Sequence, residues 1–211
     1  MKKTTSLQTI LTVIFVSAML ISNIITSKQL QFPFSITMTG AIVIFPVTYI
    51  LSDVFSECYG YKWSRLTCYL AFTMNLLMVL VFTLTIILPS PAYWENQEAY
   101  KTILGNSPRV LASSLLAYVV GDFINDKIFQ KMKAKHENET KGFGFRAIVS
   151  SIGGNFIDSF IFLPLAFYGQ MSLKALGVMC ITQVGLKTFY EIIVLPLTTL
   201  TVKAVNKSES E

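Results

Sequence analysis

Six apolar stretches dominate this sequence and leave the chain few folds to choose from. They lie roughly at 7–27, 37–57, 65–88, 109–130, 146–168 and 175–203. A helix that crosses a lipid bilayer needs about 20 mostly apolar residues, and each stretch meets that length. Backbone in hydrocarbon must satisfy its own polar groups, so we predict that each stretch is a transmembrane α-helix.

Composition supports the same fold class. Of the 211 residues, 53% are hydrophobic and 14% are charged, whereas soluble domains carry about 25% charged residues. We therefore expect an all-α, polytopic membrane protein whose six helices form a single domain over residues 1–211. The first stretch follows a short basic segment, as in a signal peptide. It is long enough to span a bilayer and no small-residue cleavage pattern follows, so we interpret it as a retained helix.

The basic residues of the loops predict the orientation. If the six spans alternate in direction, twelve Lys and Arg residues fall on one side and four on the other, and Lys187 stays inside a span. Basic loops face the cytoplasm, so we predict a protein of the cell (inner) membrane with both termini cytoplasmic. The net charge of +5 is then mainly a topology signal, and we expect no nucleic-acid partner.

Residue counts also argue against several kinds of chemistry. The chain has one histidine, His136, and three cysteines, none of them in CxxC spacing. A metal site or a histidine-based nucleophile relay would need more such residues. We therefore expect no metal, no cofactor and no enzymatic activity.

Two stretches in the second half of the chain resemble each other, "RVLASSLLAYVVGDFINDKIF" and "RAIVSSIGGNFIDSFIF". In this repeat Asp122 corresponds to Asn155, and Asn125 corresponds to Asp158. Repeats are common in transporters, whose substrate sites lie at the repeat interface. The Ser-Ser and Gly-Gly pairs of the repeat either let helices pack closely or leave room for a flat ligand.

Among the polar and charged side chains inside the predicted spans, eight are candidates for a site: Asp53, Glu57, Asp122, Asn125, Asn155, Asp158, Lys187 and Glu191. A charge at the bilayer centre costs upward of about 2.5–3.5 kcal/mol, so such groups face the bundle interior and pair. By helical spacing, Asn155 shares a face with Asp158, and Lys187 shares one with Glu191. Two interpretations stay open. Lys187 forms a fixed ion pair that locks helices together, or these groups form a ligand or ion site.

The stretch "FPVTYILSDVFSECYG" adds aromatic residues to this inventory. Asp53 and Glu57 are four residues apart, so both carboxylates are expected on one helix face, toward the cytoplasmic end of the second span. Phe45 and Tyr49 are also one turn apart and can stack on a flat ring. Together with the acids and amides, they indicate a planar heterocycle with amide-like or amidine-like edges.

Four blocks, "FPVTYILSDVFSECYG", "RVLASSLLAYVVGDFINDKIF", "SSIGGNFIDSFIF" and "LKTFYEIIVLPL", resemble the queuosine precursor transporter family, which is also grouped with vitamin uptake transporters. The resemblance extends from about residue 20 to 205. It implies a six-helix importer, similar in fold to the substrate-binding subunits of energy-coupling-factor transporters. The implied substrates are 7-cyano-7-deazaguanine, 7-aminomethyl-7-deazaguanine or queuine, salvaged for modification of transfer RNA.

The resemblance also implies roles for individual residues. The family's polar block of span two falls on Asp53 and Glu57, its arginine of span four on Arg109, its Asn and Asp of span five on Asn155 and Asp158, and its lysine of span six on Lys187. In span four the family has a glutamine and then an aspartate, where this chain has Asp122 and Asn125. The acid is thus displaced by one turn, and Asp122 becomes a candidate substitute.

These residues lead to a hypothesis for binding. Asp158 accepts hydrogen bonds from the guanine N1–H and exocyclic amine, a planar two-point match. Asn155 bonds the ring carbonyl or N3, and Lys187 donates to the carbonyl or keeps a carboxylate ionised. Asp53, Glu57 or Glu191 meets an aminomethyl cation or carries a coupled proton.

The expected partners are the lipid bilayer and a small 7-deazapurine substrate, and whether a homodimer forms stays open. We expect a solitary secondary carrier. The alternative is the substrate-binding subunit of an ATP-driven energy-coupling-factor vitamin transporter.

Overall fold

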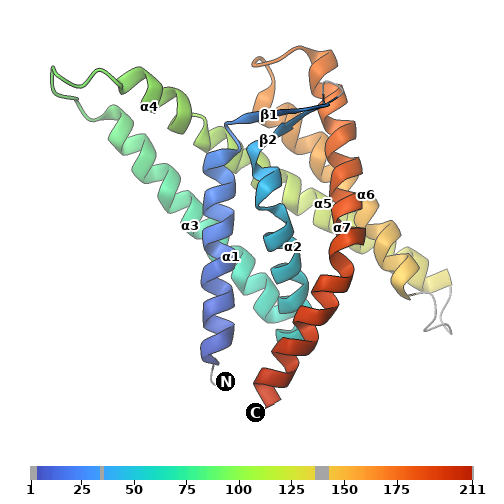
Figure 1. Ribbon diagram of the computed structural model, residues 1–211. Helices are drawn as coiled ribbons and strands as arrows, with labels where there is room; N and C mark the ends of the chain where they lie inside the picture. The colour runs from blue at the N-terminus through green and yellow to red at the C-terminus, as the bar shows by residue number, and fades with distance from the viewer. Residues whose placement is uncertain (1–3, 34–35, 136–142, 211) are drawn as a thin grey trace. The chain divides into compact units, whose positions relative to one another are not determined.

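The computed structural model describes residues 4–33, 36–135 and 143–210, and the chain is mostly helical (Figure 1). Its helices are α1 (Ser6–Ile25), α2 (Phe45–Val54), α3 (Tyr61–Ile87), α4 (Gln97–Leu104), α5 (Ser107–Lys135), α6 (Phe143–Phe167) and α7 (Leu173–Ser210). Strands β1 (Gln29–Phe32) and β2 (Ile36–Thr39) form a small two-stranded sheet. The predicted helical class is confirmed.

Four helical stretches of the described chain are long and apolar enough to cross a bilayer. They are Ser6–Ile25, Lys62–Ile87, Gln97–Gly121 and Leu173–Val194. Ile152–Phe167 is a shorter apolar helix within α6. The third stretch begins in α4, which the sequence analysis did not expect to be helical. Length and composition thus support a multi-pass membrane protein, while the full set of six spans stays a prediction.

The predicted second span, 37–57, is not one continuous helix. Strand β2 is followed by a 3₁₀-helix at Gly40–Val43, then by α2, then by a π-helical turn at Phe55–Tyr59. Pro46 lies in the first turn of α2, where its missing N–H costs no helical hydrogen bond. The segment is apolar as predicted, but its backbone changes from strand to 3₁₀-helix, α-helix and π-helical turn.

The chain divides into two compact units. The first consists of Met1–Leu30, Thr39–Leu111 and Tyr190–Glu211. In this unit α1 packs against α2 and α3, around a cluster of buried apolar side chains. Phe15 of α1 meets Phe55 edge-on, with ring centroids 5.6 Å apart. The single domain predicted from sequence stays a prediction.

The second unit consists of Gln31–Met38 and Ala112–Phe189. Leu163 and Phe167 of α6 form a buried cluster with Leu176 and Met179 of α7. Helices α5 and α6 approach closely at glycines. A Cβ atom added at Gly153 would lie 2.3 Å from Cδ1 of Ile128. The close-packing interpretation of the small residues is therefore confirmed for this glycine.

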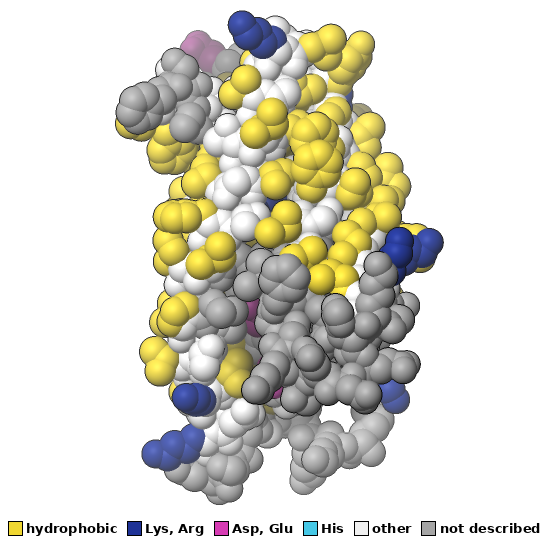
Figure 2. Space-filling view, turned by 90° about the vertical axis from the view of Figure 1, so that its right-hand side faces the viewer, with side chains coloured by type: hydrophobic (Ala, Val, Ile, Leu, Met, Phe, Trp, Pro, Cys, Tyr) yellow, Lys and Arg dark blue, Asp and Glu magenta, His cyan; other side chains and the backbone are white. Residues whose placement is uncertain are grey.

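Large apolar side chains are exposed along several helices, including Leu80 on α3 and Leu200 on α7. Figure 2 shows such side chains spread over one face of the molecule, with most of the blue Lys and Arg side chains at its margins. Exposed apolar side chains of this number suit a helical surface that faces lipid rather than water.

Candidate functional site

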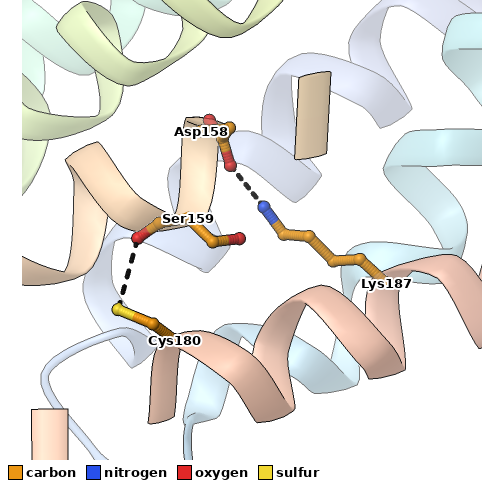
Figure 3. A network of polar contacts seen from close by, with 4 residues as sticks. All are labelled: Asp158, Ser159, Cys180 and Lys187. Atoms are coloured by element: carbon orange, nitrogen blue, oxygen red, sulfur yellow. Dashed lines mark hydrogen bonds and ion pairs between the residues drawn. The ribbon is translucent and has the colours of Figure 1, made fainter. Parts of the chain in front are cut away.

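An ion pair joins helices α6 and α7 in the second unit. The ammonium group of Lys187 donates a hydrogen bond to Oδ2 of Asp158 (Figure 3). The side chain of Lys187 is 7% exposed and that of Asp158 is 27% exposed. A lone charge between apolar helices is costly, so each group stabilises the charge of the other. The structure therefore brings together two of the predicted site residues.

Helix α5 also reaches this position because Gly121 carries no side chain. A Cβ atom at Gly121 would lie 3.1 Å from the Cβ of Asp158 and 3.1 Å from the carbonyl oxygen of Gly154. The backbone of α5 thus packs directly on the turn of α6 that carries the carboxylate. Three helices meet at Asp158, which fixes the position of its side chain.

A second contact between α6 and α7 joins Ser159, the residue after Asp158, to Cys180. The Cys180 thiol donates to the backbone carbonyl oxygen of Ser159, with sulfur and oxygen 3.8 Å apart (Figure 3). The hydroxyl of Ser159 points into the space between the two helices. Ser159 is fully buried, and its Oγ has no hydrogen-bond partner among the described residues.

Gln183 is a second buried polar side chain that lacks a partner. It is 1% exposed, and neither its amide nitrogen nor its amide oxygen is hydrogen-bonded within the described part of the chain. A buried polar group left unpaired costs about 1–3 kcal/mol. Such a cost is unusual in a folded protein and calls for an explanation.

Neither Gln183 nor Ser159 is among the site residues predicted from the sequence. Gln183 lies four residues before Lys187 in "TQVGLK", so helical spacing alone would have placed the two side chains on one face. Ser159 directly follows Asp158, but serines are frequent in membrane helices. Its burial without a partner depends on how α6 and α7 pack.

The other predicted residues of the second unit lie on α5 and α6. Asn155 is half-buried and lies one turn before Asp158 on α6. Asp122 and Asn125 lie on α5, but their side chains fall outside the described part of the structure. His136 also lies outside the described residues.

The remaining predicted residues belong to the first unit. Asp53 is exposed at the end of α2, and Glu57 is exposed in the π-helical turn. The rings of Phe45 and Tyr49 are half-buried and tilted, with centroids 6.1 Å apart. Two more residues complete this set: Arg109, exposed in the first turn of α5, and Glu191 of α7, whose side chain lies outside the described part.

The side chains of this arrangement are hydrogen-bonding groups rather than a set of metal ligands. The described residues contain no group of three or more His, Cys, Asp or Glu side chains that could hold a metal ion. The second unit instead combines one cation, one carboxylate, a neutral amide and a hydroxyl on two facing helices. These groups can donate and accept hydrogen bonds to a polar solute inside an apolar bundle.

A mostly helical chain with four stretches long and apolar enough to cross a bilayer, among its described residues, has the features of a multi-pass membrane protein. The family model described as "Putative vitamin uptake transporter" matches residues 39–201. The chain belongs to this transporter family, which is not a family of enzymes. The resemblance drawn from the sequence is confirmed.

The chain is also similar to one protein of named function. The "Probable queuosine precursor transporter" of Bacillus subtilis (strain 168) is 26% identical over 136 residues. The match covers 64% of this chain and 59% of that protein, so the chain aligns with less than two thirds of the relative. No solved structure matches the chain.

Proposed function

We propose that this chain imports queuosine precursors, the 7-deazaguanine bases 7-cyano-7-deazaguanine, 7-aminomethyl-7-deazaguanine or queuine, as a solitary secondary carrier. The observation that carries the proposal is the ion pair between the buried Lys187 and the partly exposed Asp158, which joins two apolar helices. Both residues lie in the range matched by the uptake transporter family. The similarity to a relative named as a queuosine precursor transporter supports this class of substrate.

The ion pair offers a way to receive a guanine-type edge. The base presents N1–H and the exocyclic amine to the Asp158 carboxylate, a planar two-point contact. Lys187 then turns its ammonium group to the ring carbonyl at C6. The charges that neutralise each other in the ion pair thus become hydrogen-bonding partners of the substrate. Asn155, one turn away on α6, bonds the ring carbonyl or N3.

The acids outside this pair have roles in the same proposal. Asp53, Glu57 or Glu191 binds the aminomethyl cation or carries a coupled proton. Asp122 replaces the aspartate that the family has at the position of Asn125. Arg109, Phe45 and Tyr49 complete the proposed binding residues. We place the protein in the cell membrane, with six spans and cytoplasmic termini, in a fold like that of substrate-binding subunits of energy-coupling-factor transporters.

Transport by the purified chain in liposomes tests this function. The three bases and guanine are offered separately as labelled compounds, with no ATP and no other protein. We expect uptake of at least one 7-deazaguanine base and little uptake of guanine. Saturable binding without uptake would favour the alternative, a binding subunit that needs an ATP-driven module. Absence of both binding and uptake would refute the proposed substrate class.

A further inference from the structure

The buried amide of Gln183 lies on the same side of α7 as the ion-paired Lys187. Cys180, Gln183 and Lys187 are spaced by three and four residues, so they lie along one stripe of α7. Both ends of this stripe contact α6: Cys180 at the carbonyl of Ser159, and Lys187 at the carboxylate of Asp158. Gln183 lies between these contacts, on the same buried side of the helix.

The Lys187 side chain brings its charge toward Gln183. Side chains on a helix lean toward its N-terminus, so a long lysine reaches back over the preceding turn. Figure 3 shows this course, with the Lys187 chain running from its own turn toward Asp158, in the direction of Cys180. The amide of Gln183 therefore lies one turn before Lys187 on the stripe of α7 that faces α6, on the side toward which the lysine leans.

An unpartnered amide has a defined chemical preference. Its oxygen accepts and its NH₂ group donates, so it fits a planar edge with a donor next to an acceptor. A 7-deazaguanine base has an all-donor edge at N1–H and the exocyclic amine, which suits a carboxylate. Its C6 carbonyl suits an ammonium group. With Asn155 at the ring carbonyl, the remaining edge combines the acceptor N3 with the donor N9–H, and the neutral amide of Gln183 can pair with both.

We infer that Gln183 is a specificity-determining residue that reads the N3 and N9–H edge of the bound base. The inference rests on the proposed function and adds a selection rule to it. A free base carries a hydrogen at N9, whereas a nucleoside or any N9-alkylated base does not. The transporter thus accepts free bases and rejects N9-substituted ones.

The test uses purified full-length chain in liposomes. Uptake of labelled 7-cyano-7-deazaguanine is measured in competition with the unlabelled base, its N9-methyl derivative and its O6-methyl derivative. We expect the N9-methyl compound to compete about tenfold more weakly than the parent base, since the methyl group removes the N9–H donor and leaves the buried amide oxygen of Gln183 unpaired. In Gln183→Met, affinity for the parent should fall about tenfold and the N9-methyl compound should compete equally well.

Two controls make the result specific. Met has nearly the size of Gln, so exclusion of the N9-methyl group by shape alone would persist in Gln183→Met. Gln31→Met makes the same change at an exposed amide and should behave as the wild type. Discrimination against the O6-methyl compound should be unchanged in Gln183→Met, because that edge belongs to Asp158 and Lys187.

Several outcomes would overturn the inference and leave the proposed function intact. The first is equal competition by the N9-methyl compound and the parent base in the wild type. The second is retained discrimination against the N9-methyl compound in Gln183→Met. The third is that Gln183→Met loses discrimination against the O6-methyl compound instead. If the wild type takes up none of the bases, the proposed function fails and the inference fails with it. If Gln183→Met does not fold, the wild-type competition alone decides.

Discussion

At the scale of single residues, the pair of Lys187 and Asp158 is asymmetric. The lysine is almost fully buried, while the aspartate keeps about a quarter of its side chain exposed, 7% against 27%. Loss of the aspartate would leave a buried cation without compensation, whereas loss of the lysine would leave an acid that still reaches the surface. Loss of both groups would leave neither an unpaired cation nor an unpaired acid.

We predict that Asp158→Asn lowers the free energy of unfolding by about 3–5 kcal/mol, the usual cost of leaving one member of a buried pair. Lys187→Met should cost less, and the double variant should melt close to the wild type. Thermal melting of detergent-purified protein measures all three. Lys174→Met, which neutralises an exposed lysine at the start of α7, serves as the control and should have little effect.

Uptake by the same variants separates a structural lock from a binding site. If the pair only holds α6 to α7, the double variant that restores stability should also restore transport. We expect it to stay inactive, because both charges contact the substrate. A stable double variant with normal uptake would contradict the binding role.

At the scale of elements, glycines decide how closely α5 and α6 approach. At Gly121 the neighbouring atoms are the Cβ of Asp158 and the carbonyl oxygen of Gly154, each 3.1 Å from the position that an added methyl group would take. Neither atom belongs to a flexible side-chain end. Any larger residue must therefore move one helix away from the other, and the carboxylate moves with it.

We predict that Gly121→Ala destabilises the protein by about 1–3 kcal/mol through overpacking. It should also reduce uptake, because α6 shifts at the turn that carries Asp158. Gly185→Ala is the matched control, since an added Cβ there has open space. Melting temperature and uptake are compared for the two variants. Equal behaviour would mean that the helix contact at Gly121 is not needed.

The turn between the π-helical segment and α3 depends on Gly60. Its φ of 81° and ψ of 167° lie in a region that residues with a Cβ atom rarely adopt. We expect Gly60→Ala to cost about 1–3 kcal/mol of stability, measured by thermal melting. Gly177→Ala, in the open helical environment of α7, should be neutral or stabilising by up to about 1 kcal/mol. A neutral Gly60→Ala would rule out strain at this turn.

At the scale of the whole molecule, charge distribution and helix count set the topology. An unequal share of Lys and Arg between the two sets of loops favours cytoplasmic termini. If six spans alternate as we predict, the loop before α4 is outside the cell and the start of α3 is inside. The orientation can be measured without knowing the substrate.

We predict that Tyr93→Cys, at a site 85% exposed in the loop before α4, reacts with a membrane-impermeant maleimide in intact cells. Lys62→Cys, exposed at the start of α3, should react only after permeabilisation. Both changes are made in a background that lacks Cys58, Cys68 and Cys180, which is itself the control for labelling. The reverse pattern would invert the proposed topology.

The sequence by itself determined the apolar helices, the helical class and the family, because hydrophobicity, length and motif order are properties of the local chain. It also identified Asp158, Lys187 and Asn155 as polar residues that must turn inward, since lipid penalises charge wherever it is exposed. It did not divide residues 37–57 into strand, 3₁₀-helix, α-helix and π-turn, because hydrophobicity does not encode backbone hydrogen bonding.

Only the tertiary structure decided which side chains meet. Helical spacing placed Glu191 on the same face as Lys187, whereas the packing of α6 on α7 paired the lysine with Asp158. The same packing buried Gln183 and the hydroxyl of Ser159 without partners among the described residues. A helix's rotation and register against its neighbour depend on contacts far apart in the sequence. Local pattern therefore indicated which charges are costly in lipid, but it did not indicate that Asp53 and Glu57 are exposed or that Gln183 is buried.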